Sequence, residues 1–429
     1  MATLFRGWGM QAIASMEPGK MVHSPLVSYL RSPQAIRDRC GVLFDLACQD
    51  RLAHFRCDLS QLEPTANYVL QVIRENYPDL NVPFHSRWRH FQAGGCDRLS
   101  QLQQRFSGLS SLEVARAKYD LAVTSVLLDA GAGAAWRYTE ADTGMTLSRS
   151  EGLAIASFHL FFQGGFSSDP THPFRADAIG LETFSETRFS EGFQLSEQNP
   201  LVGVSGRVGL MQRLGKTLRR SPHFFGTDLP RPGHLVDYLL TQAEENSLPA
   251  PTVLTAVLEG FSDIWGDRLT LDGENLGDVW QHSALPDTGA GSQLVPFHKL
   301  SQWLTYSLLE PLQELGLQIT HLDALTGLAE YRNGGLCLDL GLLQPKHDGV
   351  TGDRHLPGSE IIVEWRALTV ILLDQIAATL RHSLNCSAAE LPLVKVLEGG
   401  TWAAGRKIAS DRRPGGVPPI QIESDGTVF

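Results

Sequence analysis

Four long segments in the second half of the chain carry apolar residues at every third or fourth position. The longest, EIIVEWRALTVILLDQIAATLRHSL, occupies residues 360–384. This spacing gathers apolar side chains on one face of an α-helix, which a neighbouring element must cover. Candidate strands are few and do not alternate with these helices at a fixed interval. The pattern therefore predicts a mainly α, compact multi-helix fold with few short strands. The other three long helices are expected at residues 234–245, 251–265 and 298–315.

Shorter segments in the first half repeat this helical periodicity. Residues 27–47 and 66–77 place apolar side chains three or four positions apart, and residues 152–163 do so before the double glycine at 164–165. Residues 120–128, DLAVTSVLL, are mostly apolar, so a buried strand and a buried helix fit them equally well. The type of element stays open at this segment.

The sequence contains no internal repeat of fixed period, and one main domain is predicted. Residues 24–410 are expected to form a single domain, in which a helical part, residues 24–115, packs on residues 116–410. Residues 1–23 are interpreted as an N-terminal extension. Residues 411–429 are rich in Pro and Gly and are predicted to be a flexible tail.

The composition limits the class of ligand and the compartment. With 429 residues, 42% of them hydrophobic, the chain can bury a large core. A formal net charge of −11 opposes nucleic-acid binding but allows a small anionic ligand in a pocket with a few basic residues. No stretch approaches the roughly 20 apolar residues that span a bilayer, and no apolar signal core begins the chain, so a cytoplasmic protein is expected. Six cysteines without a CxxC pair indicate reduced thiols.

The densest polar motif, HSRWRH, contains His85, Arg87, Trp88, Arg89 and His90. Arginine offers planar bidentate donors to phosphate or carboxylate, and a tryptophan face can stack on a ring or a guanidinium. The motif therefore indicates a binding site, with a buried hub of ion pairs as the alternative. A metal site on the two histidines is disfavoured, because a spacing of five does not put both imidazoles on one helical face.

A glycine-rich segment begins at Asp129. SVLLDAGAGAAWRY places an apolar run, an acidic residue and GxG in the order of the first motif of methyltransferases. The third glycine is missing, and no βαβ alternation follows. The glycines can instead let the backbone turn tightly beside a pocket into which Asp129 points. Both interpretations stay open.

Charged residues also interrupt apolar segments at two later positions. Glu330 and Arg332 follow an apolar run and precede Asn333-Gly334-Gly335, which predicts a carboxylate held beside a concave site by a tight Gly-Gly turn. Helix capping with a surface ion pair is the alternative. Glu364 and Arg366 lie in the longest apolar helix, where unpaired charges would be costly. Together these positions predict a buried polar site among helices.

The order of the motifs resembles a known family. PFHSRWRHFQAGG, SVLLDAGAGAAWRY, RSEGLAIASF, NPLVGVSGR, AEYRNGG and SEIIVEWRALTV are similar to segments of the uracil catabolism protein four, or Urg, family of fungi and bacteria. The match runs from about Ser24 to Ala409. The resemblance implies a pathway that makes uracil into its nucleotide, opens the pyrimidine ring and releases urea. It also implies that the protein takes part in the step of this pathway that consumes ribosylurea or its phosphate.

A more distant similarity involves the queuosine-salvage nucleoside hydrolases, which cleave an N-glycosidic bond. HKLSQ, LTGLAEYR and EWRALT resemble the KRAQ, TMFADYR and EIRA segments of those enzymes. Their lysine corresponds to Lys299, their aspartate to Glu330 and their arginine to Arg332, and their later glutamate and arginine to Glu364 and Arg366. The longer carboxylate, and Asn-Gly-Gly in place of Val-Pro-Gln, are departures. The similarity implies an architecture like that of queuosine-salvage glycohydrolases and helical DNA glycosylases.

The expected function is hydrolysis of the N-glycosidic bond of ribosylurea or its 5′-phosphate by the domain of residues 24–410. This bond breaks through an oxocarbenium-like state that a carboxylate stabilises. Glu330 is expected to supply the carboxylate, with Lys299 and Glu364 as the other catalytic residues, and no metal or redox cofactor is required. A 5′-phosphate is assigned to Arg87, Arg89 or His90. The expected substrate-binding residues are His85, Arg87, Trp88, Arg89, His90, Asp129, Arg332, Asn333, Asp339 and Arg366.

Three other functions stay open. They are a methyltransferase that binds S-adenosylmethionine at Asp129–Gly133, a non-catalytic regulator that binds a nucleotide ligand, and a metal-dependent amidohydrolase acting on the urea group. Convergence of the polar motifs would favour the hydrolase. The residues predicted to meet in one pocket are His85, Arg87, Asp129, Lys299, Glu330 and Glu364.

Overall fold

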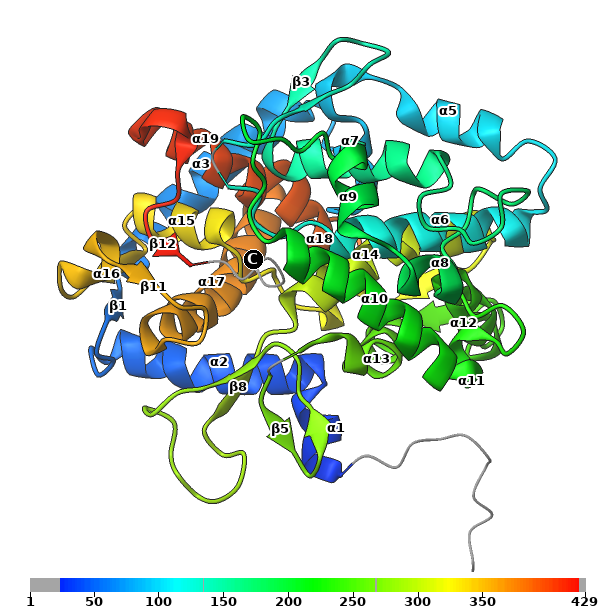
Figure 1. Ribbon diagram of the computed structural model, residues 1–429. Helices are drawn as coiled ribbons and strands as arrows, with labels where there is room; N and C mark the ends of the chain where they lie inside the picture. Colours follow the sequence, from blue (N-terminus) through cyan, green and yellow to red (C-terminus); the bar gives the residue numbers. More distant parts are fainter. Residues whose placement is uncertain (1–23, 134, 267, 424–429) are drawn as a thin grey trace, which may run out of the picture.

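The computed structural model describes residues 24–133, 135–266 and 268–423, so the expected N-terminal extension lies outside the described residues. Helices dominate, and the described strands form only two-stranded sheets, which confirms the predicted mainly α fold (Figure 1). The helices are α1 Pro25–Leu30, α2 Pro33–Cys48, α3 Leu62–Asn76, α4 Arg87–Phe91, α5 Arg98–Arg105, α6 Ser111–Leu127, α7 Arg149–Phe162, α8 Ala178–Glu182, α9 Glu186–Gly192, α10 Val204–Arg220, α11 Pro222–Phe225, α12 Leu235–Thr241, α13 Ala250–Gly260, α14 Lys299–Glu314, α15 Tyr331–Asp339, α16 Gly349–Gly352, α17 Glu360–Leu384, α18 Leu393–Lys395 and α19 Ala403–Arg412.

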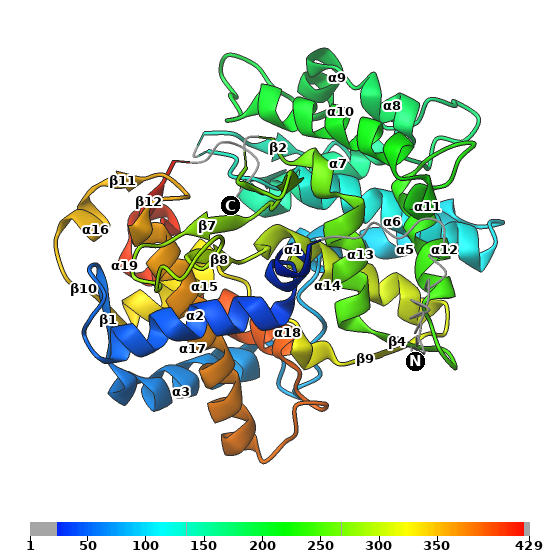
Figure 2. The ribbon, with the colours of Figure 1, turned by 90° about the horizontal axis from the view of Figure 1, so that it is seen from below.

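Helices from the two ends of the chain pack together. The long helix α17 contacts α2 and α3, and α19 contacts α3 and α15. Figures 1 and 2 show α2 and α3 beside α17, although most of the chain separates them in sequence. Helix α14 packs against α6 and α13 on the other side of the molecule. One main hydrophobic core therefore runs through both halves of the described chain.

Helix α6 answers the question left open at residues 120–128, which are helical almost to their end. Asp120 is fully buried inside it and accepts hydrogen bonds from Arg231 Nε at 2.8 Å and Gly233 N at 2.6 Å. A helix segment buried on all sides has no polar face, so its periodicity could not distinguish it from a strand. The expected division between residues 115 and 116 falls inside α6, so both parts share this helix.

Across the described ranges, no helix combines the length and the apolar character needed to cross a membrane.

The described strands connect loops in pairs and do not form a layer of the fold. Antiparallel pairs are β1 Phe55–Cys57 with β10 Leu343–Pro345, β2 Tyr138–Thr139 with β3 Thr146–Leu147, β5 Thr270–Leu271 with β6 Glu274–Asn275, and β7 Val279–Gln281 with β8 Leu294–Pro296; parallel pairs are β4 Ser247–Pro249 with β9 Gln318–Thr320, and β11 Arg354–His355 with β12 Gln421–Ile422.

The segment after α19 folds back onto the molecule, so the prediction of a flexible tail is wrong for residues 411–423. Arg413 donates two hydrogen bonds, of 2.7 and 2.5 Å, to the carboxylate of Asp339. Ile420 is fully buried, and β12 pairs with β11. These contacts join residues that are distant in sequence, so the Pro and Gly content of the segment could not reveal them.

Candidate functional site

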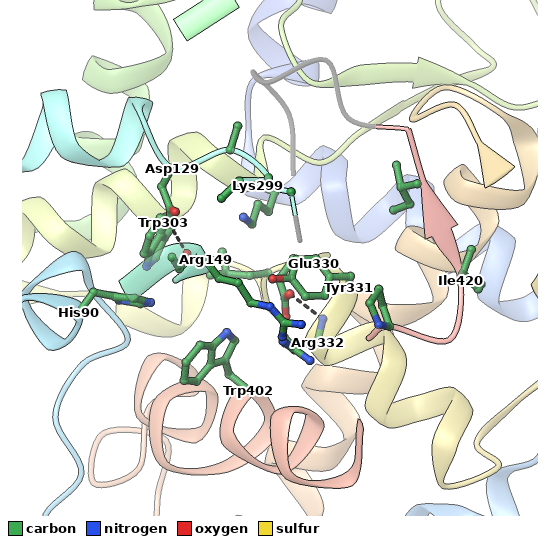
Figure 3. A pocket seen from close by; sticks show the side chains of 18 of the residues that line it. His90, Asp129, Arg149, Lys299, Trp303, Glu330, Tyr331, Arg332, Trp402 and Ile420 are labelled. Carbon is green, nitrogen blue, oxygen red and sulfur yellow. Dashed lines mark hydrogen bonds between the residues drawn. The ribbon is translucent and has the colours of Figure 1, made fainter. Parts of the chain in front are cut away.

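A cavity of about 300 Å³ lies where the ends of several elements meet. The C-terminal end of α6, the N-terminal ends of α7, α14 and α15, and the segment after α19 surround it (Figure 3). Its charged lining residues are Asp129, Arg149, Lys299, Glu330 and Arg332. Its ring-bearing lining residues are His85, His90, Trp303, Tyr331, Trp402 and Pro418.

Asp129 stands at the start of a loop that one buried arginine holds in place. Arg207 donates hydrogen bonds to the carbonyl oxygens of Leu128, of Ala130 at 2.9 Å and of Gly131 at 2.8 Å. Burial lowers the pKa of Arg207 to about 10. Gly133 has a φ of 79°, which favours glycine, so this glycine serves the turn. The loop follows a helix, whereas the methyltransferase motif follows a strand.

The carboxylate of Asp129 is fixed from behind the cavity wall. Its Oδ2 atom accepts hydrogen bonds from Arg87 Nη1 at 2.9 Å and from Ser150 Oγ at 2.5 Å. Arg87 is fully buried and also donates to Ser125 Oγ at 2.7 Å. Burial lowers the pKa of Arg87, and the negative charge of Asp129 acts in the opposite direction. Arg87 therefore does not line the cavity but orients a carboxylate that does.

Lys299 is the first residue of α14. Its backbone N donates to Asp278 Oδ2 at 3.0 Å, and its Nζ lies 5.6 Å from the centre of the Trp303 ring. The ammonium has no hydrogen-bond acceptor among the described residues. Burial lowers the pKa of Lys299, while the nearby carboxylates of Glu330 and Asp129 act to raise it. The ammonium is thus available to hydroxyl or carboxylate oxygens of a ligand.

Glu330 is the N-cap residue of α15. Its Oε2 accepts the backbone N–H of Arg332 at 2.6 Å, and its Oε1 accepts that of Asn333 at 2.7 Å. These two bonds and the partial positive charge of the helix end fix the carboxylate in place. Glu330 therefore caps α15, as the helix-capping alternative expects, and the same carboxylate also lines the cavity. A fixed negative charge suits the stabilisation of a cationic centre in a ligand.

The Gly-Gly pair after Glu330 has a different role from the expected turn. Gly334 and Gly335 lie within α15, so the prediction of a tight turn is wrong. A Cβ on Gly334 would meet Nε1 of Trp365 at 2.6 Å, and one on Gly335 would meet Cδ of Pro419 at 3.1 Å. The glycines allow α17 and the C-terminal segment to approach α15 closely, and sequence alone does not distinguish that use from a turn.

Two arginines at the cavity lie beside a turn of the C-terminal segment. Arg149 Nη2 donates to the carbonyl oxygen of Gly415 at 2.6 Å, and Arg332 Nη1 donates to that of Gly416 at 2.8 Å. Burial lowers the pKa of Arg149, and the positive charge of Arg332 lowers it further. Arg149 was not among the residues expected from the sequence, although it lies directly before the apolar run of α7.

Histidine and tryptophan rings form the opposite wall. The His90 ring lies 5.3 Å from Trp303 and 5.7 Å from Trp402, and the His85 ring lies 5.6 Å from Trp402. Burial and the charge of Arg87 lower the pKa of His90 to about 4, so its imidazole is neutral at pH 7. His85 Nδ1 lies 2.7 Å from Glu398 Oε2. In the described part of the chain, no three His, Cys, Asp or Glu side chains could together hold a metal ion.

The two tryptophans of this wall were also not expected from the sequence. Trp303 is one helical turn after Lys299, so the i,i+4 spacing on α14 could have revealed it. Trp402 ends a π-helix, Val396–Trp402, which leads into α19. Short π-helices are rare, and those that occur are often at functional sites. The local sequence does not reveal where one will form.

Glu364 and Arg366 do not line the cavity. Glu364 is fully buried, and its carboxylate accepts the backbone N–H groups of His54 at 3.1 Å and Phe55 at 3.2 Å. Arg366 donates two hydrogen bonds of 2.7 Å to Asp278. Burial raises the pKa of Asp278, but Arg366 outweighs it and holds this pKa well below its usual range. Arg366 thus supports the cavity from behind, through Asp278, which accepts the backbone N–H of Lys299, and through the carbonyl oxygen of Ala329, which accepts Arg366 Nε at 3.2 Å directly before Glu330.

Four more of the expected binding residues also have structural partners outside the cavity. Trp88 Nε1 donates to Ser307 O at 2.7 Å, and Arg89 Nη2 donates to Glu310 Oε2 at 3.0 Å. Both positions fit the alternative that HSRWRH is partly a buried polar hub. The other two are Asn333, whose Nδ2 donates to Leu328 O at 3.0 Å, and Asp339, which pairs with Arg413.

Comparison with known proteins shows the family. Residues 29–429 match the family described as protein of unknown function, DUF1688. Uracil catabolism protein 4 of Lachancea kluyveri is 38% identical over 438 residues, which cover 94% of this chain and 99% of the relative. Protein urg3 of Schizosaccharomyces pombe is 39% identical over 414 residues, with the same coverage of 94% and 99%. The resemblance expected from the motifs is confirmed. This chain belongs to the DUF1688 family and is related to uracil catabolism protein 4 and urg3.

Proposed function

We propose that this protein acts in uracil catabolism as a hydrolase that cleaves the N-ribosyl bond of ribosylurea or its 5′-phosphate. One observation carries the proposal: Asp129, Lys299 and Glu330 line one cavity beside a wall of rings. The name of uracil catabolism protein 4 supports the pathway. The chemistry of the three charged groups supports the reaction.

Hydrolysis of an N-ribosyl bond requires negative charge near C1′ and a base for water. In the proposed reaction the oxygen of water bonds to C1′ while the bond from C1′ to nitrogen breaks. Glu330 takes up one proton of the water and passes it to the leaving nitrogen, while the other proton stays on the new hydroxyl at C1′. Neutral urea therefore departs, and the carboxylate is restored. Lys299 donates hydrogen bonds to ribose hydroxyls.

In this proposal, the carboxylate of Asp129 orients the ligand. Its Oδ2 is engaged by Arg87 and Ser150, whereas its Oδ1 has no hydrogen-bond donor among the described residues. That oxygen can accept an N–H of the urea group or a ribose hydroxyl. The rings of His90, Trp303 and Trp402 give this end of the cavity a largely apolar wall, and electrostatic interactions beside such a wall are stronger than in water.

The test is to incubate the purified protein with ribosylurea and with its 5′-phosphate while urea, ribose and ammonia are measured. We expect urea and the free sugar in equal amounts from at least one compound. Glu330→Gln should remove this release, whereas Glu186→Gln, on exposed α9, should not. Ammonia in place of urea would assign the amidohydrolase reaction instead. Tight binding of both compounds without any product would assign a regulatory role.

A further inference from the structure

Arg149 and Arg332 bring two guanidinium groups to one side of the cavity. They come from different elements, because Arg149 begins α7 and Arg332 lies in the first turn of α15. Both line the cavity, and Figure 3 shows the Arg149 side chain extending toward Arg332 below Glu330. The effect of Arg332 on the pKa of Arg149 reflects their proximity.

Neither guanidinium pairs with a carboxylate among the described residues. The side-chain hydrogen bonds of both go to the backbone carbonyl oxygens of Gly415 and Gly416. Glu151, the acidic residue nearest in sequence to Arg149, pairs with Arg406. No described carboxylate therefore neutralises these two positive charges.

Three buried arginines elsewhere in the described chain are neutralised, whereas the buried Arg207 donates to backbone carbonyl oxygens and has no carboxylate partner among the described residues. Arg87 pairs with Asp129 at 2.9 Å, and Arg98 pairs with Glu140 at 2.6 Å. Arg231 pairs with Asp120 at 2.6 Å. Arg207 does not line the cavity, whereas Arg149 and Arg332 do. A cation without a carboxylate at a cavity wall is stabilised when a ligand supplies the anion. Arg149 and Arg332 are therefore placed to bind an anionic ligand.

The charges around the cavity also favour a doubly charged anion. Arg149, Lys299 and Arg332 line it as cations, and Asp129 and Glu330 line it as anions. When Arg87, which pairs with Asp129, is included, four positive charges face two negative charges. The excess of two matches a phosphate monoester, which carries close to two negative charges at pH 7.

We propose that Arg149 and Arg332 bind the 5′-phosphate of the substrate, so that the enzyme acts on phosphorylated ribosylurea rather than on ribosylurea itself. The proposal rests on the proposed N-ribosyl hydrolase function. Guanidinium forks offer bidentate hydrogen bonds to phosphate oxygens. Arg87 and Arg89, to which the sequence analysis assigned a phosphate, are instead engaged by Asp129 and Glu310.

Calorimetric titration of the full chain with ribose 5-phosphate and with ribose tests this assignment without requiring turnover. We expect ribose 5-phosphate to bind at least about tenfold more tightly, and Arg149→Gln and Arg332→Gln each to weaken its binding by about tenfold or more. Binding of ribose should change little in either variant. Arg89→Gln is the matched control and should leave both affinities unchanged.

The outcomes separate this inference from the proposed function. Equal affinity for ribose and ribose 5-phosphate, or unchanged phosphate binding in both folded variants, would overturn the phosphate site. Release of urea from unphosphorylated ribosylurea at a kcat/KM equal to that of the phosphate would overturn it too, yet leave the hydrolase function standing. Arginine-dependent binding of ribose 5-phosphate without any hydrolysis would support the site and refute the hydrolase.

Discussion

Arg87 reaches Asp129 from within the core, through a 2.9 Å hydrogen bond between Nη1 and Oδ2. The guanidinium is fully buried, whereas the carboxylate lines the cavity. The charge that a ligand meets at Asp129 is therefore set by a residue that the ligand does not touch.

We expect Arg87→Ala to lower the free energy of unfolding by about 3–5 kcal/mol, because it leaves the Asp129 carboxylate without its buried cation. Urea denaturation followed by circular dichroism measures the change. Arg89→Ala is the control, since its pair with Glu310 is partly exposed, and should cost only about 1 kcal/mol. Equal losses in the two variants would contradict the difference between the two arginines.

Glu330→Gln should fold but release urea at least about a hundredfold more slowly, because the amide cannot act as a base or stabilise a cation. The weaker helix cap should lower the free energy of unfolding by about 1 kcal/mol.

Glu364→Gln should instead lower the stability of the protein and leave turnover intact. Backbone N–H groups of residues 53–55 point at that carboxylate, so its loss should lower the free energy of unfolding by about 1–3 kcal/mol.

Product release and urea denaturation, measured on both glutamate variants, distinguish these patterns. Turnover per folded molecule should persist in Glu364→Gln. If folded Glu330→Gln still released urea at a near wild-type rate, the catalytic carboxylate would instead be Asp129.

His90 should make stability depend on pH. Its pKa is lowered from 6.5 to about 4 by burial and by Arg87, so the unfolded chain binds more protons between these values. Stability is therefore lost as the pH falls from 6.5 toward 4, by roughly 3 kcal/mol for this group. His90→Phe keeps a ring but cannot titrate, so its unfolding free energy should fall less between pH 7 and pH 4.5. Equal pH dependence in urea denaturation would show that His90 does not contribute.

Asp339→Asn should release the C-terminal segment, because it breaks the two hydrogen bonds that Arg413 makes with this carboxylate. We expect faster cleavage by trypsin after Arg412, together with weaker binding of ribose 5-phosphate. Electrophoresis and mass spectrometry of timed digests would report the cleavage. Asp411→Asn changes an exposed neighbour and should digest like the wild type.

The long helices could be predicted from the sequence because their apolar residues recur every three or four positions over many turns. Residues 120–128 lack a polar face, since even Asp120 is buried and paired. The C-terminal segment was misjudged for a related reason: what orders Ile420 is a set of distant partners rather than its own neighbours.

The site could be predicted only in part. Asp129, Lys299 and Glu330 stand at element ends, where an acidic or basic residue next to an apolar run is conspicuous. Arg87 and Glu364 looked equally conspicuous, yet their charges serve the protein's own groups. Sequence shows that a buried charge needs a partner, but it does not show whether that partner is the protein or a ligand.

The return of the C-terminal segment has a consequence for synthesis of the protein. Gln421 and Ile422 line a cavity whose other side chains come from positions 85 to 402 and from Pro418 and Ile420. During synthesis, both carboxylates and Lys299 leave the ribosome before this wall does. A chain cut short after Arg412 would lack the wall, so these three groups would face solvent on that side. Binding of a small ligand would therefore report whether the C-terminal segment has closed the cavity, which helix content alone would not.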